Sequence, residues 1–306
     1  MGCPEVLLNC IEDWKRSLDK GQHVAAILMD LSKAFDALPH SLLIAKLSAY
    51  KVSDNVCSFV YDYLTNRQQR VKIGSARSEW MNLTRGVPQG SIAGPLLFNV
   101  FISDLFLKVQ DNCCIYNYAD DNTISCSDSD LNVVKSSLEQ QSIYAINWFK
   151  NNSMKANPSK FQAIVFTRKK QKLSESFCFK IEDTEIKPTV CVKLLGISID
   201  SELTFTEHIS SLCSRASNKI SALGRISKHI TKKRRLNIFT AFISSNFMYA
   251  PLVWHVCGIT NTRKMEKLNE NALRIVFNDY MSTYVELLKL ANRHSLYVQR
   301  LQLMMV

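Results

Sequence analysis

An apolar segment that ends in an acidic residue constrains the fold of this chain most strongly. Residues 24–29 read VAAILM, and Asp30 follows them directly. A short aliphatic run of this kind predicts a buried strand. An unpaired buried carboxylate is very costly, so we expect Asp30 to lie where this strand ends and solvent begins. The pattern therefore predicts a sheet that carries a polar group at one strand end.

A second acidic feature follows 90 residues later. Residues 113–118 and 122–126 are expected to form two short strands, with Ala119, Asp120 and Asp121 at the tip of the hairpin between them. An Asp-Asp pair in this position is also common as a plain acidic turn. Three converging carboxylates would repel one another unless cations lay between them. Hard divalent cations, above all Mg²⁺, prefer such oxygen ligands, so a metal site competes with the acidic turn as an interpretation.

The remaining patterns predict a mixed α+β part of about 200 residues followed by a helical part of about 100. Helices are expected over residues 5–18, 39–50, 55–65, 92–109 and 131–148, and strands over 68–74, 79–84, 161–166, 177–181 and 192–199. The turn between the strands at 68–74 and 79–84 is expected at residues 75–78. From Phe205 onward the pattern is helical, with breaks near Thr231 and Thr260.

The two halves of the chain differ in their balance of basic and acidic residues. Residues 1–150 carry 14 Lys and Arg against 16 Asp and Glu, whereas residues 151–306 carry 24 against 11. A basic C-terminal half indicates either a surface for a polyanion or a solvated basic helix surface. The ten cysteines include no CxxC spacing, which favours reduced, mostly buried cysteines in an intracellular protein. No apolar run reaches the roughly 20 residues that span a bilayer, and no secretory signal is evident.

Several segments, taken in order, resemble the central motifs of reverse transcriptases from non-LTR (LINE-type) retrotransposons. The resemblance covers essentially the whole chain, and its order and spacing match the family. The segments are VAAILMDLSKAFD (24–36), RGVPQGSIAGPLLFNVFISDL (85–105), YADD (118–121), NPSK (157–160), KLLG (193–196) and FMYAPLVW (247–254).

The resemblance implies a catalytic triad and a nucleotide site. Asp30, Asp120 and Asp121 correspond to the triad, and the main-chain carbonyl of Leu31 to a further metal ligand. Two Mg²⁺ ions, with Mn²⁺ as an alternative, are the implied cofactors. The implied substrate-binding residues are the steric gate Phe35, together with Arg85, Gln89, Gly90 and Lys160. Without the motif, Phe35 would be interpreted as a core aromatic, and Arg85 and Lys160 as exposed structural residues.

The resemblance also implies how nucleic acid is held. Leu194, Leu195 and Gly196 correspond to the primer grip, a hairpin that positions the primer end. The basic C-terminal part corresponds to the thumb, whose cations would track phosphates without reading sequence. The cluster that we expect to contact phosphate comprises Lys219, Arg225, Lys228, Lys232, Lys233, Arg234 and Arg235.

The implied fold is an α+β right-hand polymerase. Residues 1–200 are expected to form the palm, an antiparallel sheet backed by helices, with residual fingers, and residues 201–306 a mostly helical thumb and C-terminal extension. The implied reaction is RNA-templated DNA synthesis from deoxynucleoside triphosphates, with an RNA template and a DNA primer as partners and no membrane. The expected location is intracellular, in the nucleus or the cytoplasm; the basic run at 232–235 serves equally as nuclear targeting or phosphate contact.

The chain departs from the family pattern at its beginning. Only 29 residues precede Asp30, where family members carry a longer fingers region, so we expect an N-terminal truncation. A partner chain would then supply fingers or endonuclease functions. The first rival interpretation is a catalytically silent remnant that binds nucleic acid. The second is another palm polymerase, such as a group II intron maturase or a viral RNA polymerase; DLSKAFD and the aromatic gate at Phe35 argue against the latter.

Overall fold

The computed structural model describes residues 2–167 and 173–303. The chain forms two compact units. We call Arg16–Thr189 the sheet unit, and the residues up to Lys15 together with those from Val190 onward the helical unit. Helix α1 (Cys3–Asp19) begins in the helical unit, and its last turn belongs to the sheet unit. The expected division into palm and thumb near residue 200 stays a prediction.

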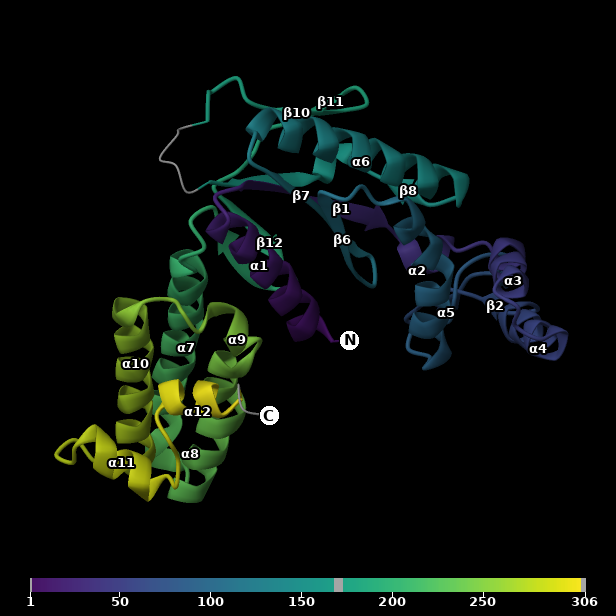
Figure 1. Ribbon diagram of the computed structural model, residues 1–306. Helices are drawn as coiled ribbons and strands as arrows, with labels where there is room; N and C mark the ends of the chain where they lie inside the picture. The colour runs from purple at the N-terminus through teal and green to yellow at the C-terminus, as the bar shows by residue number, and fades with distance from the viewer. Residues whose placement is uncertain (1, 168–172, 304–306) are drawn as a thin grey trace. The chain divides into compact units, whose positions relative to one another are not determined.

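The sheet unit is built on a fully antiparallel sheet with β1 (His23–Ser32) at its centre. On one side β1 pairs with β7 (Asp121–Asp128), which pairs in turn with β6 (Cys113–Tyr118). On its other side β1 pairs with β9 (Gln162–Phe166) and, at its end, with β8 (Lys155–Ala156). The antiparallel sheet expected from the sequence is confirmed (Figure 1).

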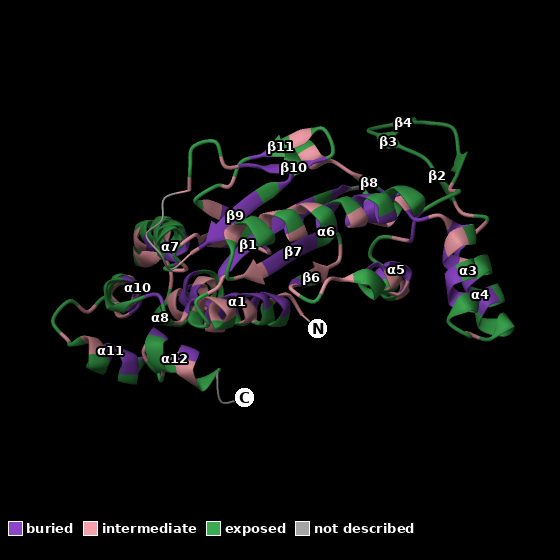
Figure 2. Cartoon of the chain, turned by 45° about the horizontal axis from the view of Figure 1, so that its top comes forward, coloured by how far each residue is buried: buried purple, intermediate pink, exposed green. Residues whose placement is uncertain are grey.

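Both faces of β1 are buried, which explains why its sequence is apolar without alternation. Val24, Ala25, Ala26 and Ile27 are each at most 1% exposed. Helix α6 (Leu131–Asn151) lies along one face of the sheet, with its apolar residues at helical spacing facing β1 and β7. Figure 2 shows the resulting buried layer along β7.

Four further helices of the sheet unit precede β6. They are α2 (Ala34–Ala37), α3 (His40–Ala49), α4 (Asp54–Leu64) and α5 (Ala93–Ile102), and a 3₁₀ turn (Ser103–Lys108) continues α5. Lys46 ties α3 to α5, since its Nζ donates to the Phe101 carbonyl at 2.8 Å and to Asp104 at 2.7 Å. Burial lowers the pKa of Lys46, and Asp104 opposes that effect.

Two strand predictions are wrong in detail. Residues 68–82 form a ribbon of four short strands, β2 (Gln68–Gln69), β3 (Lys72–Ile73), β4 (Ala76–Arg77) and β5 (Met81–Asn82), with the turn at Gly74-Ser75 instead of 75–78. Residues 192–199 were expected as one strand. They form a hairpin of β12 (Cys191–Leu194) and β13 (Ile197–Asp200), because Leu195 and Gly196 adopt positive φ angles of 45° and 85°.

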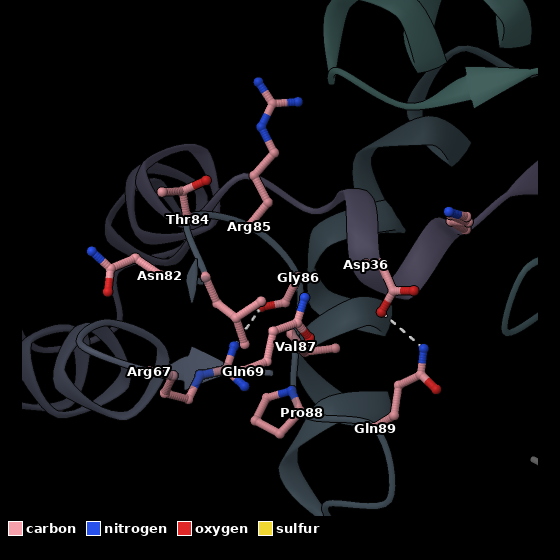
Figure 3. Close-up of a pocket in the computed structure, with 12 residues that line it drawn as sticks. Asp36, Arg67, Gln69, Asn82, Thr84, Arg85, Gly86, Val87, Pro88 and Gln89 are labelled. Carbon is pink, nitrogen blue, oxygen red and sulfur yellow. Dashed lines mark hydrogen bonds between the residues drawn. The ribbon is translucent and has the colours of Figure 1, made fainter. Parts of the chain in front are cut away.

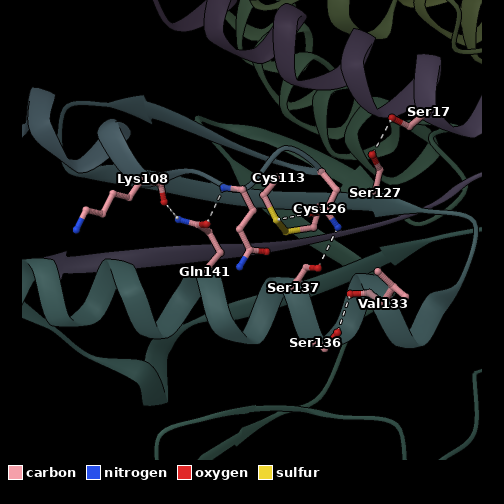
Figure 4. Close-up of a disulfide and its surroundings, with 11 residues drawn as sticks. Ser17, Lys108, Cys113, Cys126, Ser127, Val133, Ser136, Ser137 and Gln141 are labelled. Atoms are coloured by element: carbon pink, nitrogen blue, oxygen red, sulfur yellow. Dashed lines mark hydrogen bonds between the residues drawn. A yellow bond between two sulfur atoms is a disulfide. The ribbon is translucent and has the colours of Figure 1, made fainter.

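The expectation of reduced cysteines is wrong for one pair. The register of the β6–β7 hairpin places Cys113 directly opposite Cys126, with 4.0 Å between their Cα atoms, and a disulfide joins them (Figure 4). Spacing along the sequence does not reveal this pairing, because it depends on the strand register. Of the other eight cysteines, which are free, four are buried, and Cys114 alone is exposed.

The helical unit contains the β12–β13 hairpin and the helices after it. α7 (Thr206–Ile226) packs against α10 (Ile259–Phe277) through buried residues such as Leu212 and Leu273. Its shorter α-helices are α8 (Lys232–Ile238), α9 (Pro251–Trp254), α11 (Tyr284–Leu290) and α12 (Leu296–Gln302). The hairpin of β10 (Phe179–Ile181) and β11 (Thr184–Ile186) belongs instead to the sheet unit. The expected break near Thr231 is confirmed, since its side chain caps α8.

Within residues 2–167 and 173–303, none of the helices is long and apolar enough to cross a membrane.

Candidate active site

The strand register brings together the acids that the sequence singled out. Asp30 lies directly opposite Asp121 at one end of the β1–β7 ladder, and Asp120 lies in the β6–β7 turn beside it. All three residues are exposed. The prediction of adjacent strands is therefore confirmed for Asp30 and Asp121, whereas Asp120 lies in the turn and not on a strand.

Two asparagines, which the sequence interpretation missed, hold the turn that carries Asp120. Asn117 Nδ2 donates to the Ala119 carbonyl at 3.0 Å and to Asn122 Oδ1 at 2.8 Å. Asn122 is 2% exposed, and its own Nδ2 donates to the Asp120 carbonyl at 3.1 Å. Ala119 takes a left-handed conformation with φ of 55°. An asparagine on each side of the acidic tip was the signal available in the sequence.

The carboxylates form a strongly negative cluster. Burial raises the pKa of Asp121, and the neighbouring charges of Asp120 and Asp30 raise it further. Lys160 supplies a compensating positive charge, with its Nζ 3.5 Å from Asp30 Oδ2. The sequence-predicted Lys160 therefore lies beside the acids, although its side chain is 59% exposed.

The acids are suited in chemistry to a divalent metal, because Mg²⁺ prefers carboxylate oxygens and takes the rest of its ligands from water and substrate. In the described part of the chain, no three His, Cys, Asp or Glu side chains are grouped closely enough to hold an ion as they stand. Burial and the repulsion from Asp120 and Asp30 both raise the pKa of Asp121, and a bound cation would relieve that repulsion.

The raised pKa of Asp121 predicts how pH affects the stability of the metal-free chain. A raised folded-state pKa means that ionised Asp121 costs stability above that pKa, and that the cost disappears as the pH falls toward the unfolded value of 3.8. We expect Asp121→Asn to raise the melting temperature at pH 7 in EDTA, by an amount that shrinks as the pH approaches 4. Thermal unfolding followed by circular dichroism measures this, with the exposed Asp111→Asn as control. A variant that is no more stable than the parent at pH 7 would refute the predicted cost of ionised Asp121.

Main-chain hydrogen bonds join the segment after β1 to the segment before α5. Val87 N donates to the Phe35 carbonyl at 2.9 Å, and Gly86 N donates to the Leu38 carbonyl at 2.7 Å. Gly86 has a φ of 83°, and an added Cβ would lie 2.8 Å from Asp36 Cα. A glycine is therefore required where the two segments cross.

Phe35 and Gln89 are each held by a residue that the sequence interpretation missed. The Phe35 ring stacks on the buried Phe98 ring, with centroids 4.6 Å apart. Gln89 Nε2 donates to Asp36 Oδ1 at 2.8 Å (Figure 3). Because an ionised carboxylate only accepts hydrogen bonds, this contact turns the Gln89 amide oxygen away from Asp36.

The other predicted nucleotide residues have less defined surroundings. Arg85 is exposed, and its main chain forms an isolated antiparallel β-bridge with Pro39. Gly90 has a φ of 82° and open space around it, which suits close approach of a ligand to the backbone. Leu31 is buried, and its backbone pairs with Ala156 of β8.

The predicted primer grip and basic cluster belong to the helical unit. Leu194 ends β12, and the Leu195 carbonyl accepts a hydrogen bond from Tyr249 at 2.7 Å. Six of the seven basic residues are exposed, whereas Arg235 is half-buried and donates to the Ser227 carbonyl at 3.1 Å. The six are Lys219, Arg225, Lys228, Lys232, Lys233 and Arg234.

The sequence of the chain matches one family model and is similar to several known proteins. The family model described as reverse transcriptase (RNA-dependent DNA polymerase) matches residues 7–199. A probable RNA-directed DNA polymerase from transposon BS of Drosophila melanogaster is 24% identical over 271 residues, which is 85% of this chain and 30% of the relative. The RNA-directed DNA polymerase from mobile element jockey of the same organism is 23% identical, over 89% of this chain and 30% of its own length. The chain thus spans about a third of these relatives.

A solved structure shows a similar fold. Apo telomerase from Candida tropicalis superposes with a TM-score of 0.51 and 12% identity, covering 92% of this chain and 46% of the telomerase chain. At this level of identity the likeness concerns the fold alone. The resemblance to non-LTR retrotransposon reverse transcriptases inferred from the sequence is confirmed.

Proposed function

Because the chain belongs to the reverse transcriptase (RNA-dependent DNA polymerase) family, we propose that it extends a DNA primer along an RNA template with deoxynucleoside triphosphates. One observation carries the proposal. The antiparallel register sets Asp30 opposite Asp121, with Asp120 in the adjoining turn, at an exposed end of the central strands. Three carboxylates grouped at a solvent-facing end of the sheet are suited to hold cations against a phosphate substrate.

The residues that would hold metal are Asp30, Asp120 and Asp121, with the Leu31 carbonyl oxygen. Enzymes of this family use divalent metal ions. Two Mg²⁺ ions bound there would activate the primer hydroxyl and neutralise charge on the departing pyrophosphate. Lys160, whose Nζ lies 3.5 Å from Asp30, would donate a proton to that leaving group.

The residues around Phe35 would select the nucleotide. The Phe35 ring, held by its stack on Phe98, would exclude a ribose 2′-hydroxyl by steric contact. Gln89, with its amide oriented by Asp36, would contact the incoming nucleotide or the template. Gly90 and Arg85 would lie close to the same substrate, where the backbone is accessible and a cation is available.

The helical unit would hold the template–primer duplex. The Leu194-Leu195-Gly196 turn would position the primer end as the primer grip, supported by the Tyr249 hydrogen bond. The exposed basic side chains of α7, of α8 and of the turn between them would contact phosphates, so that affinity falls with salt. Arg235 would instead support the turn between these two helices, because its guanidinium is committed to Ser227.

The gate assignment predicts a change in sugar selectivity. Phe35→Ala removes the ring that would clash with a 2′-hydroxyl, so incorporation of ribonucleotides relative to deoxynucleotides should rise by tenfold or more, about 1.4 kcal/mol of lost discrimination. Single-nucleotide extension with dTTP and UTP measures the ratio. Phe106→Ala, at a 38% exposed phenylalanine beyond α5, is the control. An unchanged ratio in the Phe35 variant would refute the gate.

Primer extension by the purified chain tests the proposal as a whole. With poly(rA)/oligo(dT), dTTP and Mg²⁺, we expect elongated DNA that depends on the RNA template. The rival function, a catalytically silent nucleic-acid binder, predicts salt-sensitive binding of the same duplex with no extension at any enzyme concentration. Extension with ribonucleotides in preference to dTTP would favour an RNA polymerase instead.

A further inference from the structure

One main-chain carbonyl of the sheet unit accepts hydrogen bonds from two side chains that have no part in the proposed reaction. His40 Nε2 lies 2.8 Å from the Gly86 carbonyl oxygen, and Arg67 Nη2 lies 3.0 Å from the same oxygen. Figure 3 shows the bond from Arg67. A carbonyl oxygen only accepts hydrogen bonds, so His40 must carry a proton on Nε2, and its two lone pairs accommodate both donors.

His40 reaches Gly86 because of the strand-like contact just before it. His40 is the first residue of α3, and the main chain of the preceding Pro39 forms a β-bridge with Arg85. This bridge places the start of α3 beside the residue that follows Arg85. The His40 side chain is buried there, with 6% of the residue exposed.

Arg67 reaches the same carbonyl from the end of α4. Its Nε donates to the carbonyl of Leu64, the last residue of α4, at 3.0 Å. Its main-chain carbonyl accepts a hydrogen bond from Leu83 N at 2.8 Å. The last carbonyls of a helix have no partner within the helix, and a cation there also interacts favourably with the helix dipole. The planar guanidinium donates to two carbonyls at once, which a lysine ammonium does not do in this fixed geometry.

The hydrogen bonds to Gly86 act on Phe35 through a single peptide unit. The Gly86 carbonyl and the Val87 N–H belong to the same planar amide, which rotates as a whole. Val87 N donates to the Phe35 carbonyl at 2.9 Å. The amide is therefore held by two side chains through its oxygen and by Phe35 through its nitrogen. Gly86 is buried, so its carbonyl depends on donors from the protein.

Arg67 also lies where it could contact a substrate directly. Its side chain is half-buried and lines a cavity of about 610 Å³ that Gln89 lines as well. His40 does not line that cavity, and it is too buried to reach a ligand there. The acceptor that the two side chains share favours one role for both, and His40 separates this role from direct contact.

We propose that His40 and Arg67 are positioning residues that hold Phe35, through the Gly86–Val87 peptide, where its ring selects the sugar of the nucleotide. The inference rests on the proposed function for the role of Phe35. Neither side chain touches the substrate in this role. Removing either donor should therefore change sugar selectivity in the same direction and by a similar factor.

Single-nucleotide extension with dTTP and UTP tests the proposal. His40→Leu removes one donor at similar volume, and Arg67→Met removes the other. The ratio of kcat/KM for dTTP to that for UTP should fall about fivefold in both variants, because a misplacement of about 1 Å can change a rate by about a hundredfold and this one is smaller. The same folded molecules use both nucleotides, so the ratio does not depend on the fraction of the chain that is folded.

Conservative variants separate positioning from direct contact. His40→Gln should restore most of the ratio, because its amide Nε2 can donate in place of the imidazole. Arg67→Lys should stay close to Arg67→Met, because lysine keeps the charge but lacks the planar fork. A direct contact with phosphate would instead be restored by lysine.

A matched control lies in the helical unit. Arg293 is half-buried like Arg67 and also donates to two acceptors, the hydroxyls of Ser244 and Thr240, at 3.1 and 2.9 Å. Arg293→Met removes an equivalent pair of hydrogen bonds away from Gly86, and it should keep the selectivity of the parent.

Hydrogen exchange supplies a measurement that needs no catalysis. Exchange of the amides in residues 83–90 is followed by mass spectrometry, with the amides of β1 as the internal reference. In His40→Leu and Arg67→Met the Val87 amide should exchange about tenfold faster, whereas the amides of β1 should keep the parent rate. Equal acceleration in β1 would indicate general destabilisation and would count against the proposal.

The results distinguish this inference from the proposed polymerase function. An unchanged nucleotide ratio in both variants overturns the inference, even if exchange is faster, and so does a loss in Arg67→Met without one in His40→Leu. In either case a parent chain that extends primers keeps the proposed function. A parent chain that extends no primer refutes that function, and the exchange rates then decide alone whether the two side chains hold the peptide: an unchanged Val87 rate overturns the inference.

Discussion

Asp120→Asn should reduce primer extension by the purified chain by roughly a thousandfold or more, equivalent to about 4 kcal/mol of transition-state stabilisation. Asparagine keeps the size of the side chain but removes the negative charge and one carboxylate oxygen from the edge that Asp30 and Asp121 share. The loss should appear in the rate of extension at saturating dTTP. Asp120 is exposed and its charge repels Asp121, so the melting temperature should stay the same or rise slightly.

The same variant separates catalysis from binding. Duplex affinity should stay at the parent value, because the proposed phosphate contacts lie on the basic helices of the helical unit. Asp111→Asn, at an exposed acid preceding β6, removes the same charge at the opposite end of the β6–β7 hairpin and should extend primers normally. Residual extension above a tenth of the parent rate in the Asp120 variant would contradict the assigned role.

Gly86→Ala should destabilise the sheet unit by about 2–4 kcal/mol. The added Cβ would lie 2.8 Å from Asp36 Cα, 2.9 Å from the Asp36 carbonyl oxygen and 3.0 Å from the Phe35 carbonyl oxygen, which are all main-chain atoms. The backbone must shift to accommodate it, which costs about 1–3 kcal/mol, and the φ of 83° adds about 1 kcal/mol of strain for a residue with a side chain. Urea unfolding measures the sum.

Gly90→Ala is a matched control for this prediction. Gly90 has nearly the same φ, 82°, but an added Cβ meets no atom within 4 Å. It should therefore cost only the strain, about 1 kcal/mol. Equal destabilisation by the two variants would show that the close contact between residue 86 and the Asp36 main chain is not the cause of the lost stability. The backbone shift in Gly86→Ala should also displace Phe35, which would weaken discrimination between dTTP and UTP.

Local patterns were sufficient to predict the central sheet. The apolar run at 24–29 is compatible only with a buried strand. The acids at 120–121 indicate a turn, because aspartate is disfavoured inside a strand. Their meeting with Asp30 followed from antiparallel pairing, which the motif order implied. This part of the site could be inferred because each acid is adjacent to a strong strand signal.

Contacts between segments distant in sequence could not be predicted in the same way. The Asp36–Gln89 hydrogen bond joins residues 53 positions apart, and the Phe35–Phe98 stack joins two aromatics that each look like core residues alone. The Cys113–Cys126 bond depends on a register that composition does not encode. The turn at Leu195-Gly196 was hidden because it interrupts an apolar run, where leucine rarely adopts a positive φ.

The most direct test of the account counts the divalent ions that the carboxylate edge holds. Electron paramagnetic resonance can follow Mn²⁺ titrated into the chain bound to a dideoxy-terminated template–primer and dTTP. The account predicts that the complex of the parent chain takes up at least one ion more than the same complex of Asp120→Asn. Equal uptake by the two complexes would contradict the assignment of Asp30, Asp120 and Asp121 as the metal site.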